Sequence, residues 1–324
     1  MRFDLLAIGD SSIDELIKIH DASTQCRLDT KECHLCLDYA GKIPVDEFST
    51  SIAGNASNVV IGTAKLGLKS TIYSEFGDDQ NAQRFISEYK RLGINTDFCI
   101  LNKNSETNVH QIISYNQERT ILSYHAKRDY KVQNWGVPKI LYYSSLAEGF
   151  ETFQTQLIEF INVNRNKILV VFNPGTYQFK AGPENIREFL KVTDILFVNK
   201  EEAKKIVQKD SLEEISKEIS NYGVNLVVIT DAQNGAVAFD KNDFYKNGIH
   251  KTELPIVDKT GAGDAFTSGF LASIFYGNSI KNSLKWGTLN ASYSIRKKGA
   301  IEGLLTKSQI LEKINTESFL SPTI

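Results

Sequence analysis

The chain has 324 residues, of which 41% are apolar and 23% charged, and its formal net charge is −2. This balance is average for a soluble globular protein and gives no general attraction to nucleic acid or to anionic membranes. No stretch approaches the roughly 20 apolar residues of a membrane helix, and the N-terminal MRFDLLAIGD lacks the pattern of a signal peptide. We therefore expect a cytoplasmic protein without nucleic-acid or membrane partners.

The cysteines and histidines form no recognisable ligand set. In a chain of this length without a secretion signal, we expect the four cysteines to be free thiols. The spacing within Cys33–Cys36 suggests a zinc site, but such sites normally need a second ligand pair, which Cys26 and Cys99 do not form. We therefore interpret this spacing as coincidence, and His110 and His125 as ordinary polar residues of the core or surface.

Apolar strand patterns alternate with helical patterns along the chain, which predicts an α/β fold. We expect strands at residues 4–9, 70–76, 138–144, 168–172, 195–198 and 226–230, and helices after Asn55, near residues 79–92 and between the later strands. Several strands are apolar throughout, which favours a parallel sheet with helices on both faces. Ligands of such sheets bind at the carboxyl ends of the strands. As this rule predicts, the candidate motifs all follow apolar segments; they begin at Gly9, Asn173, Asn199, Thr230 and Gly261.

Two segments, residues 13–52 and 105–131, do not fit this alternation. Within the second, residues 110–115 and 120–124 alternate between polar and apolar side chains, as exposed strands do. Residues 116–119, Asn-Gln-Glu-Arg, are expected to form the turn between them. The segment therefore predicts two strands with one face in solvent.

The most informative stretch is DKTGAGDAFTSGF, residues 258–270. Gly261, Ala262 and Gly263 carry almost no side chain, so their backbone N–H groups can approach an anion, and the positive end of the following helix favours negative charge. Asp264 lies within reach of that anion. A carboxylate with an ordinary pKa of roughly 4 could accept the proton of a hydroxyl that attacks a phosphate. The pattern predicts a kinase that acts on an alcohol.

The ordinary alternative is a tight loop with an acid that caps the helix, since Asp and Gly are favoured at helix starts. Two better-known glycine motifs do not fit. A Rossmann fingerprint needs a third glycine where this chain has Phe266, and a Walker loop needs Ser or Thr after Gly-Lys, whereas Gly41-Lys42 is followed by Ile43.

At this stretch the sequence resembles the ribokinase-like (PfkB) carbohydrate kinases, whose signature is typically Asp-Thr-Thr-Gly-Ala-Gly-Asp before an apolar helix. Residues 258 and 260–266 match, and Lys259 stands where a small or β-branched residue is usual. Residues 53–58, AGNASN, are similar to the second family signature, with Ala53 for its first glycine. Two signatures in this order, roughly 200 residues apart, are much more specific than either alone.

The resemblance implies a doubly wound, mostly parallel sheet with helices on both faces, plus a small β-sheet lid. It assigns residues 1–12, 53–104 and 132–324 to a nucleotide-binding core, and residues 13–52 and 105–131 to the lid over the sugar. Such a lid matters because closure keeps water away from the transferable phosphate.

The resemblance places the sugar beside Asp14, whose carboxylate can accept two hydroxyl hydrogen bonds at once. Gly54, Asn55 and Asn58 belong to the same implied site: Gly54 admits the sugar closely, and Asn58 can both donate and accept. The alternatives are a solvated acid beyond a strand for Asp14 and a helix-start residue for Asn58.

On the phosphate side, Asn199 and Glu202 resemble the family's Asn-x-x-Glu motif and could organise Mg²⁺ through its waters. An Asn N-cap with acids in the first turn is the alternative, and both roles can hold together. Ala232 replaces the middle glycine of the family's Thr-x-Gly-x-x-Gly pattern, and Ala cannot take a positive φ as cheaply. The implied ATP-binding residues are Asn199, Thr230, Gly235, Gly261, Gly263 and Asn290.

The implied reaction is in-line transfer of the ATP γ-phosphate to a hydroxymethyl group, with Asp264 as the base and the amides of residues 261–263 stabilising the developing charge. Some family members use a monovalent cation, so potassium activation at Asp258 and Thr260 is a secondary hypothesis.

The acceptor is left open among ribose, a ketohexose and a nucleoside such as adenosine. After Phe172 the chain reads NPGTYQ and lacks the Asp-x-Asn-x-Arg pattern that is common in fructokinases. A nucleoside kinase and a sensor of the same fold without turnover are the alternatives to a sugar kinase. The oligomeric state is also open, although lid-mediated homodimers occur in the family.

Overall fold

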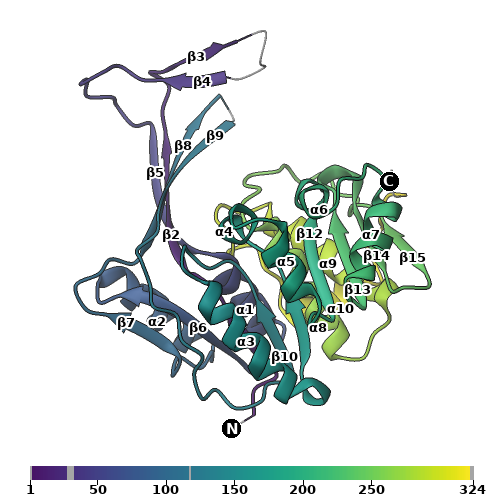
Figure 1. Ribbon diagram of the computed structural model, residues 1–324. Helices are drawn as coiled ribbons and strands as arrows, with labels where there is room; N and C mark the ends of the chain where they lie inside the picture. Colours follow the sequence, from purple (N-terminus) through teal and green to yellow (C-terminus); the bar gives the residue numbers. More distant parts are fainter. Residues whose placement is uncertain (1, 28–32, 117, 322–324) are drawn as a thin grey trace.

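The computed structural model describes residues 2–27, 33–116 and 118–321, and its central feature is a nine-stranded sheet (Figure 1). In spatial order the strands are β15 (Phe244–Asn247), β14 (Ala236–Phe239), β13 (Leu226–Thr230), β12 (Ile195–Asn199), β11 (Leu169–Phe172), β10 (Ile140–Tyr143), β1 (Leu5–Ile8), β6 (Ser70–Gly77) and β7 (Cys99–Asn102). Neighbours from β7 to β13 pair in parallel, and β14 and β15 add an antiparallel edge. The six strands predicted for the parallel sheet are all present in it.

Helices cover both faces of the large sheet. They are α1 (Asn55–Lys65), α2 (Gln80–Arg91), α3 (Glu151–Val163), α4 (Thr176–Lys180), α5 (Pro183–Leu190), α6 (Lys200–Ile206), α7 (Leu212–Asn221), α8 (Ala262–Phe275), α9 (Ile280–Ser294) and α10 (Lys307–Lys313). In β1, Leu5 and Ala7 pack in one hydrophobic cluster with α1, α8 and α9, whereas Leu6 and Ile8 pack in the other with α3, α5 and α7. The sheet is therefore doubly wound, as predicted. None of the helices in the described ranges is long and apolar enough to span a membrane.

A second, small sheet projects from the body of the molecule (Figure 1). Its order is β5 (Glu47–Ala53), β2 (Ser12–Lys18), β8 (Asn108–Tyr115) and β9 (Glu118–Tyr124). The two strands predicted around residues 110–124 are confirmed, but the connection is shorter than predicted, because Arg119 already lies in β9. Gln117 of the predicted turn lies outside the described residues.

The hairpin at the outer end of the small sheet corrects one prediction. β3 (Ser23–Cys26) and β4 (Cys33–Cys36) pair antiparallel with Cys26 opposite Cys33, and these two residues form a disulfide. The expectation of four free thiols is therefore wrong for this pair, because the strand register, which spacing does not reveal, brings the two sulfur atoms together. Cys36 and Cys99 are free. Within the described residues, no group of three or more His, Cys, Asp or Glu is arranged to hold a metal ion.

Helices α1 and α8 pack closely, and this contact positions the site. A Cβ atom added to Gly62 of α1 would lie 2.3 Å from the Ser268 Oγ and 2.6 Å from the Ser268 Cβ on α8. The absence of a side chain at Gly62 thus lets the two helices approach. Their N-terminal ends meet, so that Asn55 and Asn58 of α1 reach Asp264 of α8.

Candidate active site

Asp264 is a buried carboxylate in the first turn of α8, only 7% exposed. Its Oδ1 accepts a hydrogen bond from Asn55 Nδ2 at 3.1 Å, and its Oδ2 accepts one from Asn58 Nδ2 at 2.8 Å. Burial raises the pKa of Asp264 to about 7, against the lowering effect of the two amide donors, and the carboxylates of Glu202 and Asp14 add to the rise. Asp264 can therefore exchange a proton near neutral pH.

The glycine loop before α8 borders a cavity of about 230 Å³. Gly261 is the N-cap, with a left-handed φ of 72°, and an added Cβ would lie 2.5 Å from the Ala300 Cβ. A Cβ on Gly263 would meet no atom within 4 Å, so the backbone there faces open space. Because the first N–H groups of a helix have no partner within it, this end of α8 can receive an anion. The cavity is lined by Asn55, Asn173, Phe197, Val198, Asn199, Glu202, Thr230, Lys259, Gly261, Ala262, Gly263, Asp264 and Thr267.

Asn199 and Glu202 form a capping box at the start of α6 and also line this cavity. The Asn199 Oδ1 accepts from the Glu202 amide at 2.9 Å, and the Glu202 Oε2 accepts from the Asn199 amide at 2.9 Å. The other carboxylate oxygen, Oε1, accepts no hydrogen bond from the described residues. Burial raises the pKa of Glu202 above its ordinary value. The helix-capping alternative is therefore present, and it leaves one acidic oxygen of Glu202 for a ligand.

The connection from β13 to β14 contributes Thr230, which lines the cavity, but not Gly235. Gly235 has a φ of 108°, and an added Cβ would lie 2.2 Å from the Asn247 carbonyl oxygen. Packing against β15 therefore explains why this position has no side chain. Ala232 takes a φ of 44°, in the left-handed region that glycine occupies more cheaply.

Asn290 is not brought into the cavity. It is fully buried on α9, where its Nδ2 donates to the Ala265 carbonyl at 2.8 Å and to the Ser268 hydroxyl at 3.1 Å. Its Oδ1 accepts from the Leu305 amide at 2.9 Å. The amide group is occupied by these bonds between helices, and Asn290 does not line the cavity.

Asp14 lies on β2, beside two histidines that belong to no sequence motif of the site: His110 on β8, and His125, which directly follows β9. The pairing of β2 with β8 sets Asp14 opposite His110, and Asp14 Oδ1 lies 3.2 Å from His110 Nδ1. His110 Nε2 lies 3.1 Å from His125 Nε2, and His125 Nδ1 lies 3.7 Å from Asp10 Oδ2. The result is a row in which two imidazole rings lie between two carboxyl groups. Only the strand register, not a motif, could have revealed it.

Several buried polar atoms around this row have no hydrogen-bond partner among the described residues. They are Asp10 Oδ2, Asp14 Oδ1, His125 Nδ1 and the Oδ1 of Asn58. Buried polar groups are normally paired, so these atoms call for a ligand or water with several polar groups. Gly54 lies next to them as the N-cap of α1, with a φ of 101°, and an added Cβ would lie 2.6 Å from the Asp10 carbonyl oxygen. The close approach of the Asp10 backbone therefore requires a glycine at position 54.

Asp258 and Thr260 lie together at the start of the glycine loop. The Asp258 Oδ1 accepts from the Thr260 amide at 2.8 Å, and its Oδ2 accepts from the Gly299 amide at 3.0 Å. Burial alone would raise the pKa of Asp258, but these bonds, with one from Arg119, lower it to about 2. The carboxylate is therefore ionised at neutral pH.

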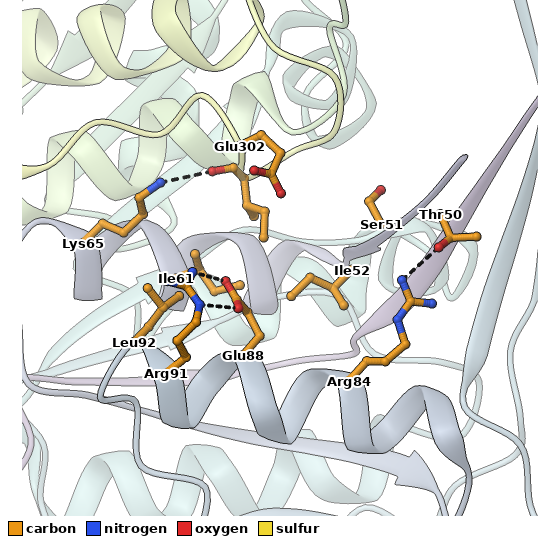
Figure 2. Close-up of a pocket in the computed structure, with 11 residues that line it drawn as sticks. Thr50, Ser51, Ile52, Ile61, Lys65, Arg84, Glu88, Arg91, Leu92 and Glu302 are labelled. Carbon is orange, nitrogen blue, oxygen red and sulfur yellow. Dashed lines mark hydrogen bonds and ion pairs between the residues drawn. The ribbon is translucent and has the colours of Figure 1, made fainter. Parts of the chain in front are cut away.

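A second cavity, of about 350 Å³, lies between α1, α2 and β5 (Figure 2). Four of its five charged side chains bind protein atoms: Arg91 pairs with Glu88, Arg84 Nη2 donates to the Thr50 hydroxyl at 2.9 Å, and Lys65 donates to the Ile301 carbonyl at 3.3 Å. Asp264 does not line this cavity. The second cavity is therefore not the candidate active site.

Residues 14–307 match the model of the pfkB family of carbohydrate kinases. The chain belongs to this family. Among curated relatives, an ATP-dependent 6-phosphofructokinase of Thermoanaerobacterium thermosaccharolyticum is 24% identical over 319 residues, which cover 94% of this chain and 91% of the relative. A nucleoside kinase of Methanocaldococcus jannaschii is 26% identical over 304 residues, which cover 87% and 94%. The predicted family and the prediction of a kinase that acts on an alcohol are confirmed.

Solved structures share the fold over nearly the whole chain. A ribokinase of Thermotoga maritima superposes with a TM-score of 0.77 at 19% identity and covers 97% of this chain and 100% of its own. A ribokinase of Arabidopsis thaliana, in complex with ribose and ATP, has a TM-score of 0.77 at 19% identity and covers 96% and 98%. The fold is therefore ribokinase-like, as predicted.

Proposed function

We propose that the protein transfers the γ-phosphate of ATP to a hydroxymethyl group of a small, uncharged carbohydrate. The observation that carries this proposal is the buried Asp264 carboxylate, held by two amide donors at the N-terminal end of α8 beside the cavity. A group with a pKa of about 7 is well matched to accept a hydroxyl proton near neutral pH. Asp264 is thus the proposed general base.

On the phosphate side, the amides of Gly261, Ala262 and Gly263 are proposed to stabilise the charge that develops on the transferred group. Asn199 and Glu202 fit Mg²⁺ held through water, because they line the same cavity and the Glu202 Oε1 is not used in the capping box. Bound Mg²⁺ would neutralise charge on the ATP phosphates.

On the acceptor side, Asp14, Gly54, Asn55 and Asn58 are proposed to surround the sugar. The buried oxygens of Asp10, Asp14 and Asn58 that accept no hydrogen bond from the described residues support this proposal, since a polyol brings several hydroxyl donors. Three carboxylates, Asp10, Asp14 and Asp264, would repel an anionic acceptor. We therefore place an unphosphorylated sugar before a phosphosugar.

A nucleoside is the second candidate acceptor. Support comes from the nucleoside kinase among the relatives and from an aromatic group near the acceptor side. The Tyr177 ring lies edge-on to His125, with 5.5 Å between ring centroids, and aromatic rings favour contact with a base. The acceptor panel described below includes nucleosides for this reason.

The remaining parts of the proposal concern the small sheet and the loop. We propose that residues 13–52 and 105–131 act as a lid over the acceptor, and that two lids join in a homodimer. A monovalent cation at Asp258 and Thr260 is a secondary hypothesis, and it competes with Arg119 for the same carboxylate oxygen.

Turnover of Mg²⁺-ATP, followed as ADP release against pentoses, hexoses, sugar acids, phosphosugars and nucleosides, tests the proposal. We expect strong release with one acceptor, and a loss in kcat of about 10² to 10⁴ in Asp264→Asn with ATP binding retained. Asp210→Asn is the matched control, because the side chain of Asp210 is 99% exposed and does not line the cavity. ATP binding without release for any acceptor would instead favour the sensor of the same fold.

A further inference from the structure

The most unusual contact of the glycine loop is made by an arginine from the small sheet. Arg119 Nη2 donates to Asp258 Oδ1 at 2.9 Å, and Arg119 Nη1 donates to the Thr260 hydroxyl at 2.5 Å. The Asp258 side chain is 8% exposed and that of Arg119 is 31% exposed. A carboxylate buried to this extent needs a compensating charge. Arg119 supplies it, with both arms of its rigid guanidinium in use.

The two partners come from different parts of the fold. Arg119 lies on β9 of the small sheet, whereas Asp258 and Thr260 precede α8 in the body of the molecule. A second link joins the same two parts, because Lys298 of the body pairs with Glu47 at the start of β5. A cavity of about 140 Å³ beneath these links is lined by Asp14 and Arg119 together. The links therefore close the outer edge of the acceptor side.

The residues as arranged do not fit a monovalent cation at this place. Such an ion would have to bind oxygen atoms of Asp258 and Thr260, and the Asp258 Oδ1 and the Thr260 Oγ1 both accept hydrogen bonds from Arg119. The Asp258 Oδ2 is taken by the Gly299 amide. An ion beside these oxygens would also face the like charge of the guanidinium.

We propose that Arg119 takes the place of a monovalent cation at Asp258, and that it positions the glycine loop only when the small sheet is closed. Thr260 directly precedes Gly261, the N-cap of the helix that carries Asp264. A shift of Asp258 and Thr260 would therefore move the anion-binding amides. Arg119 is a positioning residue, and one contact couples closure over the acceptor to the geometry that receives phosphate.

The first test is cation exchange on the full-length enzyme at constant ionic strength. We expect the kcat of the wild type to be unchanged when K⁺ is replaced by tetramethylammonium. Arg119→Ala is expected to lower kcat about 10²-fold, the cost of a small misplacement of reacting groups, with little change in the KM for ATP. In that variant, kcat is expected to recover partly with guanidinium ion or with K⁺, whereas a merely structural loss would not respond.

Arg84→Ala is the matched control. Arg84 also links the body of the molecule to the small sheet, because its Nη2 donates to the Thr50 hydroxyl at 2.9 Å. It lies at the second cavity, however, and not at Asp258 (Figure 2). We expect Arg84→Ala to show no response to guanidinium or K⁺. Arg119→Lys keeps the positive charge but cannot donate two hydrogen bonds in the geometry of a guanidinium, so its kcat is expected to lie between those of Arg119→Ala and the wild type.

A measurement without turnover completes the test. In crystals soaked with Rb⁺, anomalous scattering is expected beside Asp258 in Arg119→Ala and absent there in the wild type. The proposal is overturned if K⁺ strongly activates the wild type, if Rb⁺ binds there with Arg119 present, or if Arg119→Ala turns over like the wild type. Each of these outcomes still leaves an active kinase, so the proposed function is tested separately by Asp264→Asn.

Discussion

As the proposed base, Asp264 would have to be buried to meet a hydroxyl away from water, yet ionised to accept the proton. Burial raises its pKa, whereas hydrogen bonds from the side-chain amides of Asn58 and Asn55 lower it, and the resulting pKa is about 7. Each amide donor stabilises the charged form, because it hydrogen-bonds a carboxylate oxygen. The two asparagines of α1 thus increase the ionised fraction of the proposed base at neutral pH.

A pH profile of kcat/KM for the acceptor tests this balance, since that quantity reports the ionisation of the free enzyme. With a pKa of about 7, the protonated and inactive form of Asp264 dominates on the acid side. We therefore expect kcat/KM to fall as pH decreases below about 7. In Asn58→Ala a bond to the charged form is lost, so the acid limb is expected to move to higher pH.

Asp210→Asn serves as the control, and its kcat/KM is expected to fall over the same acid pH range as that of the wild type. The residual kcat/KM of Asp264→Asn is expected not to fall over this range. A wild-type profile that stays level well below pH 7 would contradict the role of Asp264 as the base.

At the scale of residues, the sequence predicts what lies in contiguous motifs and fails where pairing register decides. Asp264 and Asn58 come from two short signatures, and the structure joins them at 2.8 Å. His110 reaches Asp14 only because β2 and β8 pair in one particular register. Asn290 forms buried hydrogen bonds between helices, and a lone polar residue on a helix carries no sequence signal that separates such a contact from a ligand contact.

At the scale of elements, the contact between α1 and α8 determines whether the two signatures meet. Gly62 is in the interior of α1, where helix propensity alone would favour Ala by about 1 kcal/mol. Packing opposes this preference, because an added Cβ would lie 2.3 Å from the Ser268 Oγ. The same limit on sequence reasoning applies to the hairpin of β3 and β4, whose register forms a disulfide that the cysteine spacing did not predict.

Gly62→Ala distinguishes packing from propensity. If packing dominates, the helices must separate, and we expect a loss of about 1–3 kcal/mol in the free energy of unfolding, as for overpacked cores. Asn58 then moves away from Asp264, so kcat is expected to fall as well. Urea denaturation and steady-state kinetics measure the two effects.

The double variant Gly62→Ala/Ser268→Gly is the control, because it restores room between the helices. We expect it to recover kcat, while stability stays below that of the wild type because glycine is costly within α8. A stabilised Gly62→Ala variant with full kcat would show that the helices adjust and that the close contact does not position Asp264.

At the scale of the whole molecule, the small sheet has two faces of different composition. Asp14 and His110 lie side by side on one face, which borders the proposed acceptor site. Phe48, Leu122 and Tyr124 occupy rows of the opposite face, as the strand register shows. Their exposed fractions are 61%, 53% and 50%. Apolar side chains gathered in this way favour association, and β9 adds an unpaired sheet edge.

The proposed homodimer follows from this outer face, and its mass in solution is the measurement. We expect sedimentation to give about twice the 36.3 kDa of one chain. Phe48→Glu combined with Tyr124→Glu places charges on the apolar face and is expected to yield monomers, because a buried, unpaired charge is costly. Val163→Glu is the control: Val163 is 83% exposed at the end of α3, away from the small sheet, and its substitution is expected to leave the mass unchanged. A monomeric wild type would contradict the homodimer, and it would leave closure of the small sheet to the links that Arg119 and Lys298 make within one chain.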